Sequence, residues 1–370
     1  MKLDNQQVFF ALARAGLWEK EARLASYDKI DFQGVYRLAE EQAVLGLVTA
    51  GLEQIVDVKA PQVEVLQFVG STLQLEQTNL TMNVLVAQLI EMLCKNDINA
   101  LLVKGQGIAQ CYERPLWRSS GDIDLLLDSN NYEKAKAYLM TKADSIQPEY
   151  TSESHLGMVI EDFVVELHGT MHTRMSKRID SFIDGVQEEI FKKQKVRKWN
   201  NSVTEVCLPA PDEDVIFVFT HIIKHFFLEG IGLRHICDWC RLLWTYKDSL
   251  NYGLLESRIQ KMGLMTEWRA FAAFAVKYLG MPTDAMPLYS ADARWERKAE
   301  RICSYVMEVG NFGHKQRRDY SGMSYLWRKL VSFWGKLSVI LRHFQVFPID
   351  SIVFFGGVLR SGLYAAVRGE

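Results

Sequence analysis

Hydrophobic periodicity changes twice along this chain of 370 residues, and the change limits the folds open to it. Up to about residue 100, apolar side chains recur at helix spacing, first near Val8 and then over residues 35–56 and 61–94. Short apolar runs of strand length follow at residues 100–103 and 123–127. From about residue 212 helical spacing returns, and we expect it to continue to the end of the chain. The sequence therefore predicts an α+β protein in which helical regions flank a small sheet.

The middle region carries further strand and helix signals. Two strand candidates, residues 155–160 and 163–168, flank Glu161-Asp162, which fits a short hairpin connection. Residues 203–208 suggest one late strand, and helices are expected over residues 105–113 and 131–140. We divide the chain into an N-terminal helical region, an α/β core and a C-terminal helical domain, at residues 1–60, 61–209 and 210–370.

Composition excludes several classes of protein. Lys and Arg number 43 and Asp and Glu 45, so the net charge of −2 gives no positive field and argues against a nucleic-acid partner. Six cysteines in so long a chain are too few for a disulfide scaffold, and the N-terminus lacks a basic signal-peptide region. The most apolar late stretch, residues 349–367, contains Asp350 and Arg360 and is a poor membrane span. We therefore expect a cytoplasmic protein.

Asp122 and Asp124 form the strongest chemical signal in the sequence, at the start of the apolar run 123–127. Side chains alternate across a strand, so both carboxylates project from the same face. At this spacing they repel each other unless a cation lies between them, and Mg²⁺ prefers such hard oxygen ligands. The alternative is that both residues end a strand at the solvent without a function.

Two neighbouring features favour a functional site. Lys104-Gly105 follows the strand at residues 100–103 and opens a helix, so a lysine and backbone N–H groups could converge on an anion, although a glycine there can also be a simple turn. Glu166 lies in the middle of the apolar run 163–168, where an unpaired carboxylate is costly. If the two acidic strands are neighbours, three carboxylates converge, as two-metal phosphoryl or nucleotidyl transfer requires.

These motifs resemble those of the DNA polymerase beta-like nucleotidyltransferase superfamily. The likeness is greatest to its bacterial branch of uncharacterised nucleotidyltransferases, which has a Lys-Gly turn, an Arg-x-x-Gly-Asp-Ile-Asp-Leu run and a later acidic Leu-His strand. Here these are Lys104-Gly105, residues 118–125 and Glu166-Leu167-His168. The superfamily's usual turn is Gly-Gly or Gly-Ser, whereas Gln106 follows Gly105 in this chain.

The resemblance implies a minimal nucleotidyltransferase core with a small mixed sheet, and an activity. The enzyme would transfer a nucleoside monophosphate from an NTP to a hydroxyl and release pyrophosphate. The acceptor stays open between a small molecule, a sugar and a protein, and a non-catalytic protein that binds a nucleotide or a partner is the alternative. Asp122, Asp124 and Glu166 would hold one or two Mg²⁺ ions, while Lys104, Gly105, Arg118, Ser120 and Gly121 would bind the nucleotide.

Arg118 has two possible roles, since it could neutralise the departing pyrophosphate or pair with a carboxylate to hold its loop. His168 shares a strand face with Glu166 and could orient it, or be structural. A looser likeness continues into the later helices. In these helices His221, His225, Arg234 and Asp238, together with His168 of the strand, are candidate acceptor-site residues.

Other interpretations compete at these later positions. His221 and His225 are one helical turn apart, but the glutamate of the zinc-protease pattern is missing, so we favour a structural or substrate-lining role over zinc. Arg234 and Asp238 have the spacing of a helix-surface ion pair. Cys237 and Cys240 lack a second Cys-x-x-Cys, and we expect two packed thiols.

Residues 324–370 are rich in aromatic and basic side chains. Such a helical tail could make a weak peripheral contact with an anionic membrane or grip a nucleic acid. Packing of the tail on its own domain is the simpler interpretation.

Overall fold

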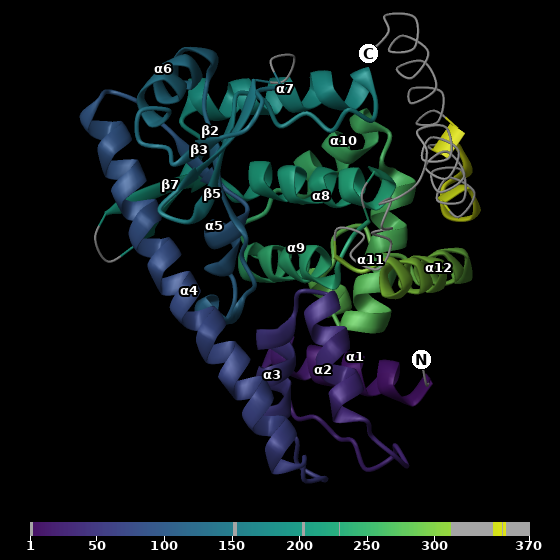
Figure 1. The fold of residues 1–370 in the computed structure, drawn as a ribbon. Coiled ribbons are helices and arrows are strands. Elements are labelled where there is room, and N and C mark those ends of the chain that lie inside the picture. The colour runs from purple at the N-terminus through teal and green to yellow at the C-terminus, as the bar shows by residue number, and fades with distance from the viewer. Residues whose placement is uncertain are drawn as a thin grey trace, which may run out of the picture.

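The computed structural model describes residues 3–150, 154–201, 204–228, 230–311, 343–349 and 351–352. Helices and strands combine in it as an α+β fold, which confirms the predicted class (Figure 1). A small mixed sheet lies beside a long helix, α4, and the later helices pack on the other side of the sheet.

The N-terminal region contains four helices: α1 (Leu3–Trp18), α2 (Phe32–Glu41), α3 (Leu45–Glu53) and α4 (Gln62–Lys95). The prediction of one helical segment over residues 35–56 was wrong, because α2 and α3 are separate. Ala43 adopts a φ of +53° between them, which interrupts a right-handed helix. Gln42 fixes the break, since its side chain donates to the carbonyl of Val306 and accepts from the amide of Leu233, both at 2.9 Å.

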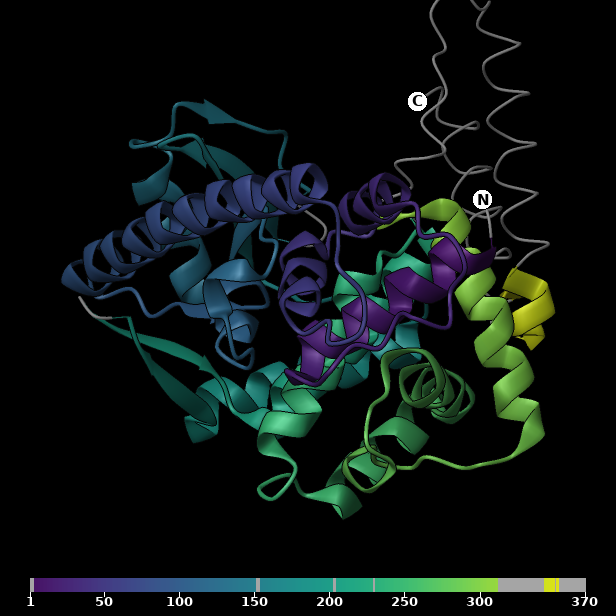
Figure 2. The same ribbon diagram turned by 90° about the horizontal axis from the view of Figure 1, so that it is seen from below.

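Helix α4 extends along one edge of the molecule (Figures 1 and 2). Its predicted helical pattern is confirmed, but several apolar residues of that pattern do not face the core: Leu66, Leu73 and Leu80 are 62%, 56% and 42% exposed. The buried face instead contains Phe68 and Leu89, which pack toward α2 and the sheet respectively.

Five strands form the main sheet, in the order β1-β2-β5-β4-β3. Strand β2 is antiparallel to β1 and parallel to β5, so the sheet is mixed as predicted. Glu161 and Asp162 form the β4–β5 hairpin turn, and both have a positive φ, as a two-residue type I′ turn requires. The strands are β1 (Leu101–Val103), β2 (Asp122–Leu126), β3 (Ser145–Ile146), β4 (His155–Ile160) and β5 (Phe163–His168).

Short helices connect these strands, and a second hairpin follows them. Helix α5 (Gly105–Ala109) and a 3-10 turn (Pro115–Trp117) join β1 to β2, and α6 (Ser129–Leu139) follows β2. The predicted late strand is β7 (Glu205–Pro209), but it pairs with a strand that was not predicted, β6 (Val196–Asn200). Helix α7 (Lys177–Lys193) was not predicted either.

The later helices share one hydrophobic core with the N-terminal helices. Helix α1 contacts α11 as well as α3, and Figure 2 shows α1–α3 between α4 and the C-terminal helices. The predicted domain boundaries near residues 60 and 209 stay a prediction. The later elements are α8 (Pro211–Leu228), α9 (Leu233–Tyr246), α10 (Tyr252–Met262), α11 (Met265–Leu279), a 3-10 turn (Thr283–Ala285) and α12 (Ala293–Val309).

Most of the tail at residues 324–370, for which a membrane or nucleic-acid contact was considered, lies outside the described residues. Within its described part, Phe347 is buried and its ring lies 5.7 Å from that of Phe226. None of the helices that the structure describes combines the length and the apolar character of a membrane span.

Candidate active site

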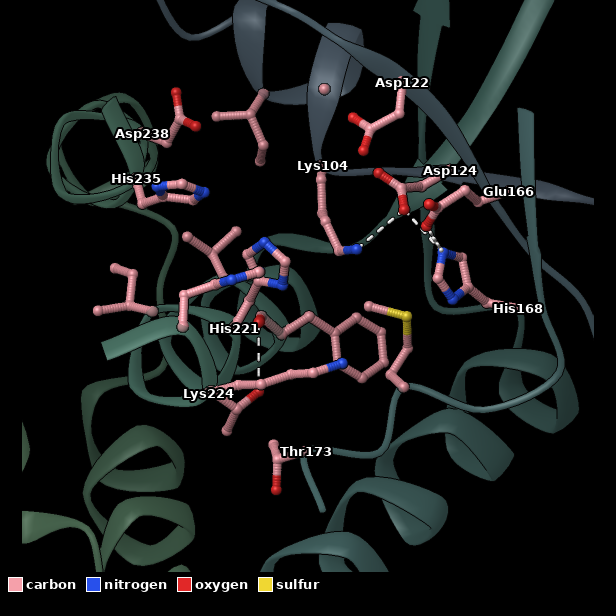
Figure 3. Close-up of a pocket in the computed structure, with 18 of the residues that line it drawn as sticks. Lys104, Asp122, Asp124, Glu166, His168, Thr173, His221, Lys224, His235 and Asp238 are labelled. Atoms are coloured by element: carbon pink, nitrogen blue, oxygen red, sulfur yellow. Dashed lines mark hydrogen bonds and ion pairs between the residues drawn. The ribbon is translucent and has the colours of Figure 1, made fainter. Parts of the chain in front are cut away.

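A cavity of about 350 Å³ lies between the main sheet and helices α8 and α9 (Figure 3). It has two contrasting sides. The strand wall is formed by Asp122, Asp124, Glu166 and His168, and the helix wall by His221, His225, Arg234, His235 and Asp238. Figure 3 shows Lys104 between these sides, with its side chain directed to Asp124.

Three carboxylates converge on the strand wall. Asp122 and Asp124 alternate with buried Ile123 on β2, and Glu166 lies beside Asp124 in the parallel β2–β5 register. One oxygen from each of the three carboxylates lies within 4.8 Å of the others. The sequence-based expectation that the two acidic strands are neighbours is therefore confirmed.

Basic side chains surround these carboxylates. Lys104 Nζ lies 2.9 Å from Asp124 Oδ1, and His168 Nε2 lies 2.7 Å from the same oxygen. His155 Nε2 lies 3.1 Å from Glu166 Oε2. His155 was missed by the sequence analysis, although a two-residue turn at 161–162 places it directly opposite His168.

The electrostatics of the strand wall are uneven. The Asp124 carboxylate and burial raise the pKa of Asp122 to about 6. Burial alone would raise the pKa of Asp124 and of Glu166. At Asp124, Lys104 and His168 outweigh burial and lower the pKa. At Glu166, hydrogen bonds from His155 and His168 do the same. His168 responds in the opposite sense, because its bonds to the carboxylates overcome burial and raise its pKa.

This donor set fits a hard divalent cation. The Asp124 carboxylate and burial raise the pKa of Asp122 although Lys104 and Arg234 lower it, so a cation bound here would relieve repulsion between the carboxylates. Carboxylate oxygens at this separation are ligands that Mg²⁺ accepts. Asp122, Asp124 and Glu166 are thus the residues that would hold such an ion.

The turn before α5 has an unusual backbone. Lys104 has a φ of +56° and Gly105 a φ of +36°, and a non-glycine residue in this region is strained. A Cβ on Gly105 would lie 3.3 Å from the carbonyl oxygen of Asp122. Gln106, where the superfamily has Gly or Ser, is buried. Its side chain donates to Asn79 on α4 and so connects the turn to that helix.

A family model agrees with this geometry. The model for uncharacterised nucleotidyltransferases matches residues 28–280, about two thirds of the chain. The chain belongs to this family. The match supports nucleotidyl transfer in general as its activity. No curated protein and no solved structure is significantly similar to the chain.

In this structure Arg118 forms a buried ion pair. Its Nε and Nη2 donate to the two oxygens of Asp238 at 3.0 and 2.7 Å, and the Tyr112 hydroxyl donates to the same carboxylate at 2.7 Å. The sequence left open whether Arg118 pairs with a carboxylate or neutralises pyrophosphate, and the structure shows the pair. Arg118 Nη1 also donates to the Ser120 hydroxyl at 2.9 Å.

The other predicted site residues differ in whether they line the cavity. Ser120 and Gly121 are not among the residues that line the cavity, so a nucleotide contact through them stays a prediction. Arg234 does line it and donates to the carbonyl oxygen of Ser119 at 2.9 Å. Cys237 and Cys240 are fully buried, which confirms the prediction of packed thiols.

Three imidazoles gather on the helix wall of the cavity. The ring centroids of His221 and His225 are 4.2 Å apart, and His235 lies 5.5 and 5.3 Å from them. Burial lowers the pKa of His221 and His235, and neighbouring cationic and imidazole groups lower it further. Burial thus favours the neutral state of His221 and His235, whereas the pKa of His168 on the strand wall is raised.

Proposed function

We propose that this protein transfers a nucleoside monophosphate from an NTP to a hydroxyl acceptor and releases pyrophosphate. The observation that carries the proposal is the convergence of Asp122, Asp124 and Glu166 on one side of a cavity in a chain of this family. Adjacent strands fix the positions of all three carboxylates, so little rearrangement is needed before a substrate binds.

The carboxylates would hold one or two Mg²⁺ ions. The metal would neutralise charge on the triphosphate and polarise the phosphoryl group that is transferred. Lys104 would exchange its ion pair with Asp124 for a phosphate oxygen, since its ammonium group already lies in the cavity. The Gly105 turn would allow the backbone to approach the triphosphate.

Glu166 would accept the proton of the acceptor hydroxyl or hold a second metal. His155 and His168 position it from two sides, through contacts of 3.1 and 3.4 Å to the same carboxylate oxygen. These contacts keep Glu166 ionised, which both roles require. The acceptor would enter from the helix wall, where His221, His225 and Arg234 line the cavity.

The proposal can be tested by incubating the protein with each of the four α-labelled NTPs, Mg²⁺ and a cell extract. Label should move to a single class of acceptor, a small molecule, a sugar or a protein, and should not move when Asp122→Asn/Asp124→Asn replaces the wild type. A matched control is Asp144→Asn, which changes a carboxylate that does not line the cavity.

The same preparation separates catalysis from binding. Thermal unfolding is followed with each NTP, with and without Mg²⁺. Mg²⁺-dependent stabilisation by an NTP without any transfer of label would favour the non-catalytic nucleotide-binding alternative. Stabilisation that persists in Asp122→Asn/Asp124→Asn would contradict a metal-bridged triphosphate.

A further inference from the structure

The helix wall carries a second cluster of potential metal ligands, separate from the carboxylates. His221 and His225 are one turn apart on α8, and His235 approaches them from α9. One ring nitrogen from each imidazole lies within 4.8 Å of the others. The sequence offered only the first two histidines as a pair, and the packing of α8 against α9 adds the third.

Three imidazoles suit a different class of metal from three carboxylates. Mg²⁺ prefers oxygen ligands, whereas imidazole nitrogen suits Zn²⁺ and similar transition metals. Zinc–nitrogen bonds of ~2.0–2.1 Å place tetrahedral ligands roughly 3.3 Å apart. Because the three nitrogens already lie within 4.8 Å of one another, each would move inward by about 1 Å at most. His221 projects into the cavity, and its side-chain torsions can supply this movement.

The surroundings of His235 resemble the support that metal ligands receive in proteins. Its Nδ1 lies 3.4 Å from the carbonyl oxygen of Gly232, the residue that precedes α9. A bond from one ring nitrogen to a backbone carbonyl commonly fixes the tautomer of a metal-binding histidine, which directs the other nitrogen to the metal. For His235 the coordinating atom would then be Nε2.

We propose that His221, His225 and His235 form a binding site for a zinc-class divalent metal, with its fourth coordination position open to the cavity. Three protein ligands with an open fourth position are the arrangement of a reactive rather than a purely structural zinc site. Lys104 and Lys224 lie near His221, so the open position favours an anionic oxygen ligand. The site goes beyond the proposed nucleotidyl transfer and does not depend on it.

A competing site lies on the strand wall. His155, Glu166 and His168 also bring three ligand atoms within 4.8 Å of one another. There, however, both imidazoles already contact carboxylates, and a zinc ion would replace those contacts. The experiment must therefore show which histidines hold the metal.

The test measures Zn²⁺ binding to the full chain by equilibrium dialysis, without nucleotide and with excess Mg²⁺ to occupy the carboxylates. One Zn²⁺ per chain is expected, with an affinity at least about 100-fold weaker in His221→Asn and His235→Asn. Asp122→Asn/Asp124→Asn and His155→Asn should bind as the wild type does. His172→Asn is the matched control, since His172 also lines the cavity but pairs with Asp184 and belongs to neither cluster.

A measurement on the unaltered chain covers the case in which a variant fails to fold. Diethyl pyrocarbonate modifies accessible imidazoles, and mass spectrometry locates the modified residues. Zn²⁺ should protect His221 from modification and leave His172 reactive. The proposal would be overturned if Zn²⁺ showed no saturable binding. It would also be overturned if Zn²⁺ protected His155 in place of His221 and the affinity fell in His155→Asn and not in His221→Asn. None of these outcomes depends on whether the protein transfers nucleotides.

Discussion

The two walls of the cavity differ in how their charges are arranged. On the strand wall, three carboxylates lie together, and a lysine and two imidazoles contact two of them, Asp124 and Glu166. Asp238 of the helix wall is paired with Arg118, and burial lowers the pKa of His221 and His235, which favours their neutral state. The strand side thus contains a carboxylate, Asp122, whose pKa is raised by its acidic neighbour and by burial.

The strand wall can therefore bind a cation, whereas Asp238 on the helix wall is already neutralised by its ion pair with Arg118. Asp122 pays an electrostatic cost in the folded chain, as its raised pKa shows, whereas Asp238 receives three hydrogen bonds from the protein itself. A change on the strand wall should therefore affect ligand binding and chemistry most, and a change at the Arg118–Asp238 pair should affect folding most.

The largest effect is expected from Asp122→Asn. The variant removes a charged oxygen ligand where the metal would bind, so we expect transfer of labelled nucleotide to fall by about 10³-fold or more. His221→Asn on the helix wall, assayed in the same way, should cost far less. Equal losses in the two variants would remove the distinction between the walls.

Arg118→Met should destabilise the fold more than any strand-wall change. The substitution leaves the buried Asp238 carboxylate without its bidentate partner, and breaking such a pair costs about 3–5 kcal/mol of unfolding free energy. Urea unfolding measures the loss. The double variant Arg118→Met/Asp238→Leu should recover part of it, and an undiminished stability of the single variant would contradict the structural role assigned to Arg118.

Local sequence patterns predict the geometry of the strand wall, whereas His221, His225, Arg234 and Asp238 of the helix wall were named through the family resemblance, and their packing could not be predicted, for a physical reason. Alternation along β2 fixes which way Asp122 and Asp124 point, and a two-residue turn at 161–162 fixes the register that follows. The Arg118–Asp238 pair joins residues 120 positions apart through the packing of a loop on α9, which no local pattern encodes.

Two elements were not predicted, helix α7 and strand β6, and only α7 has a clear sequence pattern. Helix α7 buries Ile179, Ile183 and Ile190 at helix spacing, so its pattern was readable. Strand β6 has mostly polar residues and gave no comparable signal. The exposed apolar face of α4 shows the converse, because periodicity predicted the helix but not the direction in which it packs.

Metal-free stability provides a smaller test of the strand wall. The folded pKa of Asp122 is about 6, above the ordinary value of 3.8, so its contribution to the unfolding free energy falls as pH rises from 4 to 6. Asp122→Asn removes this penalty. In the presence of a chelator, the variant should be more stable than the wild type by about 1–3 kcal/mol above pH 6, and the advantage should disappear near pH 4. A variant less stable than the wild type above pH 6 would show that the carboxylate is not under strain.

The smallest expected effect is on the pH dependence of the unfolding free energy without metal. His168 on the strand wall and His221 on the helix wall should contribute to it with opposite slopes. His168 has a raised pKa, so its stabilisation is complete below pH 6.5 and is lost as pH rises through the folded pKa. His221 has a lowered pKa, so the folded chain loses stability relative to the unfolded chain as pH falls below 6.5.

The free energy of unfolding of the wild type minus that of each Asn variant isolates these contributions. This difference should fall with rising pH for His168→Asn and increase with rising pH for His221→Asn, each by about 1 kcal/mol or more. Chemical unfolding from pH 5 to pH 8 measures both slopes. The absolute stabilities of the variants also reflect lost packing, but packing does not titrate. The slopes therefore report charge states: that of His221, and that of His168 together with Asp124 and Glu166, whose pKa values it lowers. Slopes of the same sign would mean that the two walls hold their histidines in the same state.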